Sequence, residues 1–420
     1  MRKTKALISI LCAAAVSLTC SCGSKPIVRS QNQQTVITLS WWGNDTRNDY
    51  TIEGMQQFQE LHPDIQVRCN YSEWSGYESR NRIRMISDTE EDVMQINYSW
   101  LSQYSPDGLG YYDLDSLSQY IDFSNFTKDM LEYGRVNGVL NAIPIAMNTM
   151  TIYINKTIYE KYELDVPKTW DDLFKAAEKM SNDGVYPMSA ASKSMWLLAI
   201  AYAEQISGKV ILSHDGELNF SKDDVKTMLN FYCDLVNKKV VPQVEYYDRL
   251  NINSGKYAGT VAWVSDAVNY CQSAIDSGYD IIASDYLCTE KTAPGEGWYA
   301  KPATLYAISK NTEHPEKAAQ LMNYMLNSKD MAVLQGVEKG IPLSSSARKH
   351  LEDADMLNGI QYDASLKMEE NNNLRKMNPI LENSSVIDAF IDSCNLVIYQ
   401  KDSIDNACDS FYTVLCEHVK

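Results

Sequence analysis

The sequence lacks the patterns that mark many enzymes and metal sites. Its five histidines lie far apart, and no H-x-x-x-H pair occurs that would suit zinc. It contains no G-x-S-x-G nucleophile elbow and no Walker phosphate loop. These absences argue against zinc-dependent, serine-dependent and nucleotide-dependent hydrolysis. We therefore expect no cofactor and no bound metal.

Paired cysteines are missing as well. Seven cysteines follow residue 22, and none belongs to a C-x-x-C pattern. An odd number without regular spacing does not indicate a disulfide framework, and unpaired thiols in an exported chain fit a reducing habitat. We expect most of them to be small core residues.

Positive charge is scarce relative to negative charge. The formal net charge is −17, and residues 1–21 contribute only positive charges, so the remainder is more acidic still. Such a surface repels nucleic acid and anionic headgroups. We expect no nucleic-acid partner, and a polyanionic ligand only where a local group of basic residues overrides the overall charge.

Long apolar runs are limited to the first residues. Arg2, Lys3 and Lys5 precede an apolar stretch over residues 6–18, which has the order and length of a secretory leader. The following Leu18-Thr19-Cys20-Ser21-Cys22 resembles the cleavage box of bacterial lipoproteins. We predict a signal peptide over residues 1–21, lipidation at Cys22 with Cys20 as the alternative, and a flexible stalk over residues 22–34. An ordinary cleaved signal with incidental cysteines is the competing interpretation.

The remaining chain, roughly 385 residues, is longer than one hydrophobic core usually spans and indicates two lobes. Alternating and helical periodicities predict a strand near 36–40, a helix over 50–61 that ends at His62-Pro63, a strand over 65–69, a helix near 77–86 and a strand over 92–97. This order is the βαβ signature of a parallel sheet.

Indoles follow all three predicted strands. Trp41-Trp42 follows the first, Glu73-Trp74 the second and Asn97-Tyr98-Ser99-Trp100 the third. Ligands in such sheets bind outside the carboxyl ends of the strands. Flat apolar faces beside polar groups suit sugar rings.

The middle of the chain contains further predicted elements. Thr169 and Asp172 form a capping-box pattern that predicts a helix start, so Trp170 has a structural explanation. We expect a helix over 195–206, a buried strand over 261–266, a loop over 295–302, a strand over 305–308 and a helix that begins at Pro315.

Together these segments resemble extracellular solute-binding proteins of family 1, which serve carbohydrate ABC transporters. The resemblance rests on their order along the chain, with a lipoprotein leader in front. The residues that carry it are Trp41-Trp42-Gly43, the 92–97 strand, Asn148 with Tyr153-Ile154-Asn155-Lys156, the 166–173 run, and 298–309 ahead of His314-Pro315-Glu316-Lys317-Ala318-Ala319.

The resemblance implies an α/β, two-lobe, periplasmic-binding-protein-like fold of type II, with a hinge and a central ligand cleft. The first lobe would contain residues 35–147 and 305–345, and the second 148–304 and 346–420. The implied protein is a non-enzymatic monomer, lipid-anchored outside the bacterial membrane, which delivers an oligosaccharide to ABC permease subunits.

Candidate ligand contacts are aromatic or polar. For stacking on sugar rings we select Trp41, Trp42, Trp74, Trp100, Trp196, Trp263, Trp298 and Tyr299. For hydroxyl contacts we select Asn44, Arg47, Glu73, Asn97, Asn148 and Asp266.

Two other functions remain open from sequence alone. A glycan-degrading surface lipoprotein would need two carboxylates that flank the scissile bond, for which Glu73 and Asp266 are the conceivable pair. A protein of the same fold could instead bind a peptide or act as the sensing arm of a signalling system.

Overall fold

A mixed sheet with the strand order β2-β1-β3-β9-β6-β7 runs through the fold, and β8 and β10 pair with β6 and β9. The computed structural model describes residues 34–213 and 216–419. The predicted leader, the lipidation site Cys22 and the stalk up to residue 33 therefore lie outside the described residues. The strands of the sheet are β1 (Thr35–Trp42), β2 (Ile65–Ser72), β3 (Val93–Ile96), β6 (Ala142–Asn155), β7 (Gly259–Trp263), β8 (Ile281–Ala283), β9 (Tyr299–Ile308) and β10 (Arg375–Lys376).

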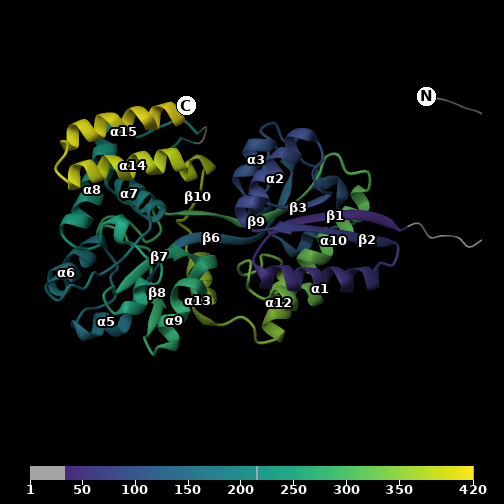
Figure 1. The fold of residues 1–420 in the computed structure, drawn as a ribbon, viewed down its shortest axis with the longest axis horizontal. Coiled ribbons are helices and arrows are strands. Elements are labelled where there is room, and N and C mark those ends of the chain that lie inside the picture. Colours follow the sequence, from purple (N-terminus) through teal and green to yellow (C-terminus); the bar gives the residue numbers. More distant parts are fainter. Residues whose placement is uncertain (1–33, 214–215, 420) are drawn as a thin grey trace, which may run out of the picture. The chain divides into compact units, whose positions relative to one another are not determined.

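The predicted βαβ unit is present at the start of the described chain. β1 pairs in parallel with β2 and with β3, and α1 (Asp45–Leu61) and α2 (Trp74–Ser87) connect them. Figure 1 shows α1 and α2 on opposite sides of these strands. Alternate residues of β1 consequently enter different cores, with Leu39 facing α1 and Ser40 bonded to Tyr77 of α2.

Two strands pass between the two halves of the sheet. The first part of β6 pairs with β9, and its second part, from Met150, pairs with β7 and β8. β9 pairs with β3 through residues 305–308 and with β6 through residues 300–307. We call β6 and β9 the crossing strands (Figure 1).

Two large hydrophobic cores lie on either side of the crossing strands, within one compact unit formed by the described residues. The first core takes residues from 37–145 and 306–343, and the second from 150–299 and 377–419. We call the elements around them the first and second lobes. The fold is therefore two-lobed, as the sequence predicted, whereas the residue limits expected for each lobe stay a prediction.

Each core is enclosed by helices. Those of the first lobe, besides α1 and α2, are α3 (Ser99–Tyr104), α4 (Lys128–Glu132), α10 (Pro315–Asn327), α11 (Lys329–Gln335) and α12 (Ser345–Asp353). Those of the second lobe are α5 (Lys156–Lys161), α6 (Trp170–Met180), α7 (Ser192–Ser207), α8 (Lys222–Asn237), α9 (Ala267–Asp276), α13 (Gly359–Glu370), α14 (Ser384–Ile398) and α15 (Ile404–His418). A two-stranded hairpin, β4 (Arg135–Val136) with β5 (Val139–Leu140), lies apart from the main sheet.

Local signals placed several helix ends correctly. α1 ends at Leu61 with His62 as its C-cap, and α10 has Pro315 in its first turn. The Thr169 side chain caps α6, and Asp172 returns the second bond of the capping box.

Three local expectations were wrong. Trp41 and Trp42 lie inside β1 because the strand continues to pair with Tyr71 and Ser72. The buried strand near 261–266 ends at Trp263, and residues 264–266 form a 3-10 turn. The expected loop over 295–302 gives way at Tyr299 to β9, which is held between β6 and β10.

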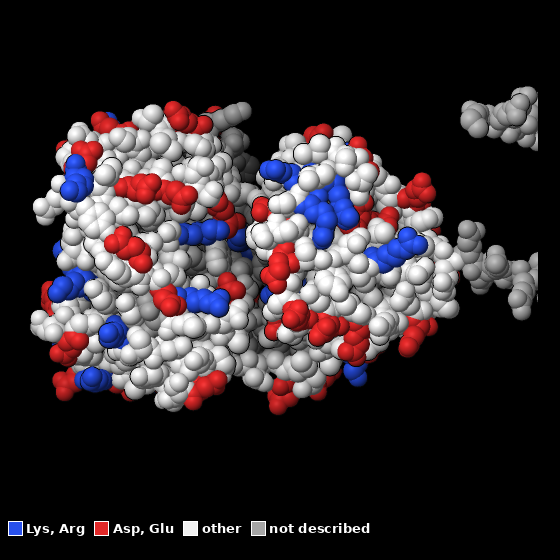
Figure 2. Space-filling view, in the orientation of Figure 1, with Lys and Arg blue, Asp and Glu red and all other residues white. Residues whose placement is uncertain are grey.

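Acidic side chains are distributed over both lobes, as Figure 2 shows for one face. Basic side chains gather on that face over α2, whose sequence contains Arg80, Arg82 and Arg84. The face is hollowed between the lobes. The overall negative charge of the chain therefore coexists with local groups of positive charge.

Candidate functional site

The indoles predicted at the three strand ends meet in the first lobe. Trp42 ends β1, Trp74 begins α2 and Trp100 lies in α3. The ring centroids of Trp42 and Trp74 are 5.0 Å apart, and Trp74 stacks on Trp100 at 5.9 Å. Trp100 is buried, Trp42 is half-buried and Trp74 is 39% exposed. The cluster therefore has a buried base and an open indole at its edge.

The neighbouring Trp41 points into the core. It is fully buried, its ring stacks on Tyr71 at 4.8 Å, and its Nε1 donates to Asn48 Oδ1 at 3.0 Å. Strand alternation explains why adjacent indoles have different surroundings, because successive side chains face opposite sides of the sheet.

Three polar candidates beside these strands have local partners. The Asn44 side chain caps α1 by accepting from the Arg47 amide, and Asn97 Oδ1 accepts from the Ser99 amide at 3.0 Å. Glu73 occupies the N-cap position of α2, is exposed and makes no capping bond. The Glu73 side chain is therefore open to solvent and has no capping partner.

Arg47 and Asp266 link the two lobes electrostatically. Arg47 lies in the first turn of α1, where its Nη2 donates to the Glu338 carbonyl at 2.7 Å. Asp266 follows β7 in the second lobe. Burial raises the pKa of the Asp266 carboxyl, and the facing Arg47 guanidinium partly opposes that rise. Arg47 of the first lobe and Asp266 of the second therefore lie close enough for their charges to interact.

The crossing strands place three candidate groups on one face. Asn148 pairs with Lys301, and Met150 pairs with Trp263, so alternation puts these side chains on the same side of the sheet. The Lys301 Nζ lies 4.8 Å from the centre of the Trp263 ring. Asn148 Nδ2 donates to Ser265 Oγ at 2.9 Å. This face forms the centre of the candidate site.

A cationic network extends from this face into the second lobe. Lys301 contacts one carboxylate oxygen of Glu382 at 2.5 Å, and Lys193 contacts the other at 2.9 Å. Burial by itself would raise the pKa of Glu382, but the two ammonium groups outweigh it and the pKa is lowered. Burial lowers the pKa of Lys301 despite this partner.

Three other aromatic candidates are committed to the core. Trp196 is fully buried and donates to the Leu381 carbonyl at 2.9 Å, and Trp298 donates to the Leu287 carbonyl at 3.0 Å. The Tyr299 hydroxyl bonds to buried Glu204. Trp170, which the sequence assigned to structure, is likewise buried and bonded to Gln205. We leave these side chains out of the site.

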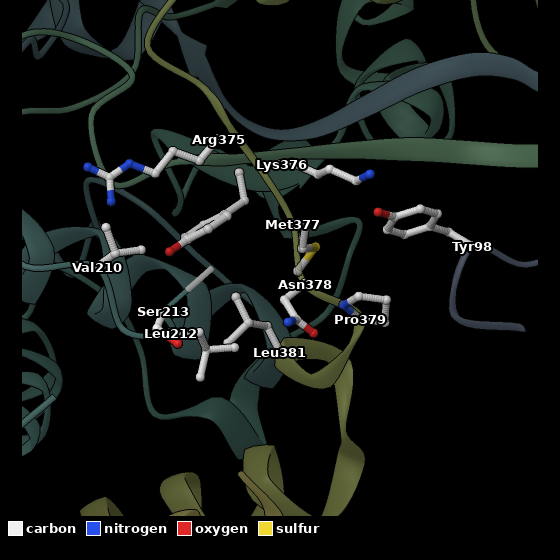
Figure 3. A pocket seen from close by; sticks show the side chains of 11 residues that line it. Tyr98, Val210, Leu212, Ser213, Arg375, Lys376, Met377, Asn378, Pro379 and Leu381 are labelled. Carbon is white, nitrogen blue, oxygen red and sulfur yellow. The ribbon is translucent and has the colours of Figure 1, made fainter. Parts of the chain in front are cut away.

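A pocket of about 440 Å³ lies beside the same segment of chain. Tyr98 of the first lobe lines it together with second-lobe residues 375–379, Leu381, Val210, Leu212, Ser213 and the predicted ligand residue Tyr299. Figure 3 shows the Tyr98 hydroxyl directed toward the 376–379 segment. The pocket therefore draws its walls from both lobes and adjoins Glu382 through Leu381.

Within the described residues, no group of three or more His, Cys, Asp or Glu side chains is placed to hold a metal ion. Their helices also include none that is long and apolar enough to cross a membrane.

The match to a family model covers residues 43–332 and decides the identification. The chain belongs to the bacterial extracellular solute-binding protein family. This is the family that the sequence resembles, and its members are binding proteins of ABC transporters rather than enzymes.

This solute-binding protein is similar in sequence to curated relatives and in fold to solved structures. The multiple sugar-binding protein of Streptococcus mutans is 25% identical over 171 residues, 40% of each chain. A periplasmic solute-binding protein of Pectobacterium atrosepticum is 28% identical, with a TM-score of 0.84 over 92% of this chain and 100% of that one. A periplasmic oligogalacturonide-binding protein of Yersinia enterocolitica, solved with saturated digalacturonic acid, is 27% identical. Its TM-score is 0.80 over 91% of this chain and 98% of that one. The chain spans between 40% and 61% of the length of the curated relatives that it matches.

Several residues of the candidate site were not predicted from the sequence. Lys193 and Glu382 were not selected, and Lys301 and Tyr98 were noted only as neighbours of aromatic residues. Nothing local marks Glu382, because its partners lie 81 and 189 residues away along the chain. Lys301 could have been found from strand alternation, since it precedes a predicted strand and pairs with Asn148.

Proposed function

We propose that this protein is the substrate-binding component of a carbohydrate ABC importer and captures an oligosaccharide between its lobes. One observation carries the proposal: indoles with exposed surface occur in both lobes, at the ends of strands. Trp42 and Trp74 come from the first lobe and Trp263 from the second. The residue limits predicted for the lobes, the Cys22 anchor and the monomeric state belong to this proposal.

The chemistry of the site suits a saccharide. An indole offers a flat apolar face to the C–H groups of a sugar ring, and fixed polar groups bind its hydroxyls. Arg47 and Asp266 supply a donor and an acceptor from the two lobes, and Asn148, on a crossing strand, is bonded to Ser265 beside Asp266. A ligand that spans three indoles needs more than one ring, which favours an oligosaccharide.

Binding would act through the hinge equilibrium. A sugar that contacts both lobes stabilises the closed form by the free energy of the contacts made only in that form. The ABC permease would then receive the ligand from the closed protein. The names of the Streptococcus and Yersinia proteins, one sugar-binding and one oligogalacturonide-binding, support a carbohydrate ligand.

Calorimetric titration of the purified protein against neutral and acidic oligosaccharides, with a reducing-end assay of each mixture afterwards, tests the proposal. We expect micromolar or tighter binding of one intact sugar class and at least tenfold weaker binding by Trp263→Ala. Trp170→Phe, which alters a buried indole, is the matched control. New reducing ends would show that the protein cleaves the sugar, and hydrolysis would then replace transport as the proposed function. Absence of binding across the panel would overturn the proposal in favour of a peptide or sensing role.

A further inference from the structure

The Lys193–Glu382–Lys301 network has more positive than negative charge. Two ammonium groups share one carboxylate, and each contacts a different oxygen of it. The network therefore carries one uncompensated positive charge in a chain whose net charge is −17. The two lysines also repel each other, since Lys193 contributes to lowering the pKa of Lys301.

Burial makes the pairing of two of these charges necessary. The side chains of Lys301 and Glu382 are 10% and 12% exposed. Charges removed from water must be paired to offset the lost hydration, and one carboxylate balances only one ammonium. The second ammonium, that of Lys193, is left without a counter-charge of its own, and a further anion there would balance the network.

Unused hydrogen-bond donors remain in the network. An ammonium group has three N–H donors, and the bonds described here use one from Lys301 and one from Lys193. The Lys193 side chain is 41% exposed, so its remaining donors are accessible to a ligand. Trp263 extends the network with an aromatic ring beside Lys301.

The start of α7 adds to the positive potential. Lys193 lies in its first turn, and the N-cap residue Ala191 supplies no side-chain bond to the free amides there. The helix has 16 residues, so a substantial dipole ends at this point. An anion beside Lys193 would meet both the ammonium group and the helix terminus.

We propose that the Lys193–Glu382–Lys301 network with Trp263 is a subsite for the carboxylate of a uronic-acid residue, so that the transported ligand is an acidic oligosaccharide. The inference rests on the function proposed above. The carboxylate binds the free Lys193 donors and balances the single excess charge, while the sugar ring lies near Trp263. A monoanion matches that balance better than a dianionic phosphate, which would leave the subsite negative.

The test uses oligogalacturonate, oligoguluronate and glucuronate-containing oligosaccharides, each paired with its neutral methyl ester, and adds a neutral oligosaccharide panel. We expect at least one acid to bind about 10- to 100-fold more tightly than its ester, the range of a lost charge-assisted hydrogen bond. Lys193→Met should remove that preference. Lys193→Arg should retain it.

Lys209→Met is the matched control. Lys209 is 44% exposed and pairs with Asp224, whose side chain is 12% exposed, so the variant removes the same charge from a similar ion pair in the same lobe. It should leave the acid preference intact. Two results would overturn the subsite and leave the proposed function standing. One is binding of neutral sugars with no preference for any acid, and the other is an acid preference that survives Lys193→Met. Failure of every sugar to bind would overturn both, and tighter binding of phosphorylated sugars would replace the uronate with a phosphate.

Discussion

Asn148 and Ser265 exchange two hydrogen bonds across the crossing strand β6 and the turn that follows β7. Asn148 Nδ2 donates to Ser265 Oγ at 2.9 Å, and the Ser265 amide donates to Asn148 Oδ1 at 3.1 Å. The turn places Trp263 on one side of Ser265 and Asp266 on the other. Asn148 therefore fixes two candidate ligand groups relative to the hinge.

Asn148→Ala should destabilise the protein by about 1 to 3 kcal/mol, because it removes both bonds at a buried position. Ser265→Ala removes only the hydroxyl and retains the amide bond, so its effect should be about half as large. Urea unfolding followed by near-ultraviolet circular dichroism measures both. Equal effects of the two variants would mean that the amide bond to Asn148 contributes nothing.

Trp74 and Trp100 stack on each other but should respond differently to truncation. Trp100 is 2% exposed, and Trp100→Ala should cost about 3 to 5 kcal/mol of unfolding free energy by leaving a cavity. Trp74→Ala should cost about 1 kcal/mol or less, since 39% of that residue is exposed. Its effect should instead be weaker binding of the oligosaccharide found by titration. A Trp74→Ala variant with full affinity would remove this indole from the site.

The fold could be predicted largely from the sequence because its signals are local. Alternation and helical spacing set the order β1, α1, β2, α2 and β3, and the Thr169 and Asp172 pair set the start of α6. Strand ends were less predictable. Tyr299 joins a strand because Arg375 of β10 pairs with it, and this partner lies about 75 residues away along the chain.

The site could be predicted only in part for the same reason. The meeting of Trp42, Trp74 and Trp100 follows from the shared edge of parallel strands. Trp41 was predicted from the same strand end as Trp42, and Trp196 and Trp298 from their residue type. All three are buried, because core packing is the ordinary place of an indole. The Lys193–Glu382–Lys301 network joins three distant segments, and no spacing in one sequence reports such contacts.

Glu204 should make stability depend on pH. Burial is the main cause that raises the pKa of this carboxyl to about 7, while Tyr299, the Ile211 amide and Arg375 oppose it. The folded-state pKa of Glu204 is above its unfolded pKa near 4.5, so the protonated carboxyl contributes its full stability below pH 4.5. This contribution is lost as the pH rises through about 7. The loss should be on the order of 3 kcal/mol.

Glu204→Gln should flatten this dependence between pH 4.5 and 8 in urea unfolding, because the amide does not titrate. Glu178→Gln, an exposed position on α6, serves as the control and should follow the parent protein. A parent protein whose stability rises across this range would contradict the assignment to Glu204.

Lys339 should be replaceable by methionine with a gain in stability. It is 2% exposed, its Nζ contacts the Tyr306 hydroxyl at 2.7 Å, and burial followed by the nearby Arg47 charge moves its pKa well below the usual range. The Lys339 side chain binds a proton more weakly in the folded chain than in the unfolded chain. Below its unfolded pKa near 10.5 this residue therefore opposes folding, and it opposes folding less as the pH rises.

Lys339→Met retains the apolar stem and removes this cost, so we expect the free energy of unfolding at pH 7 to rise by about 1 to 3 kcal/mol. The gain should shrink as pH is raised toward 9.5, which separates it from a simple improvement in packing. Lys310→Met, at an exposed position, should change stability by about 0.5 kcal/mol or less at either pH. A loss of stability in Lys339→Met that is the same at both pH values would mean that the bond to Tyr306 outweighs the buried charge.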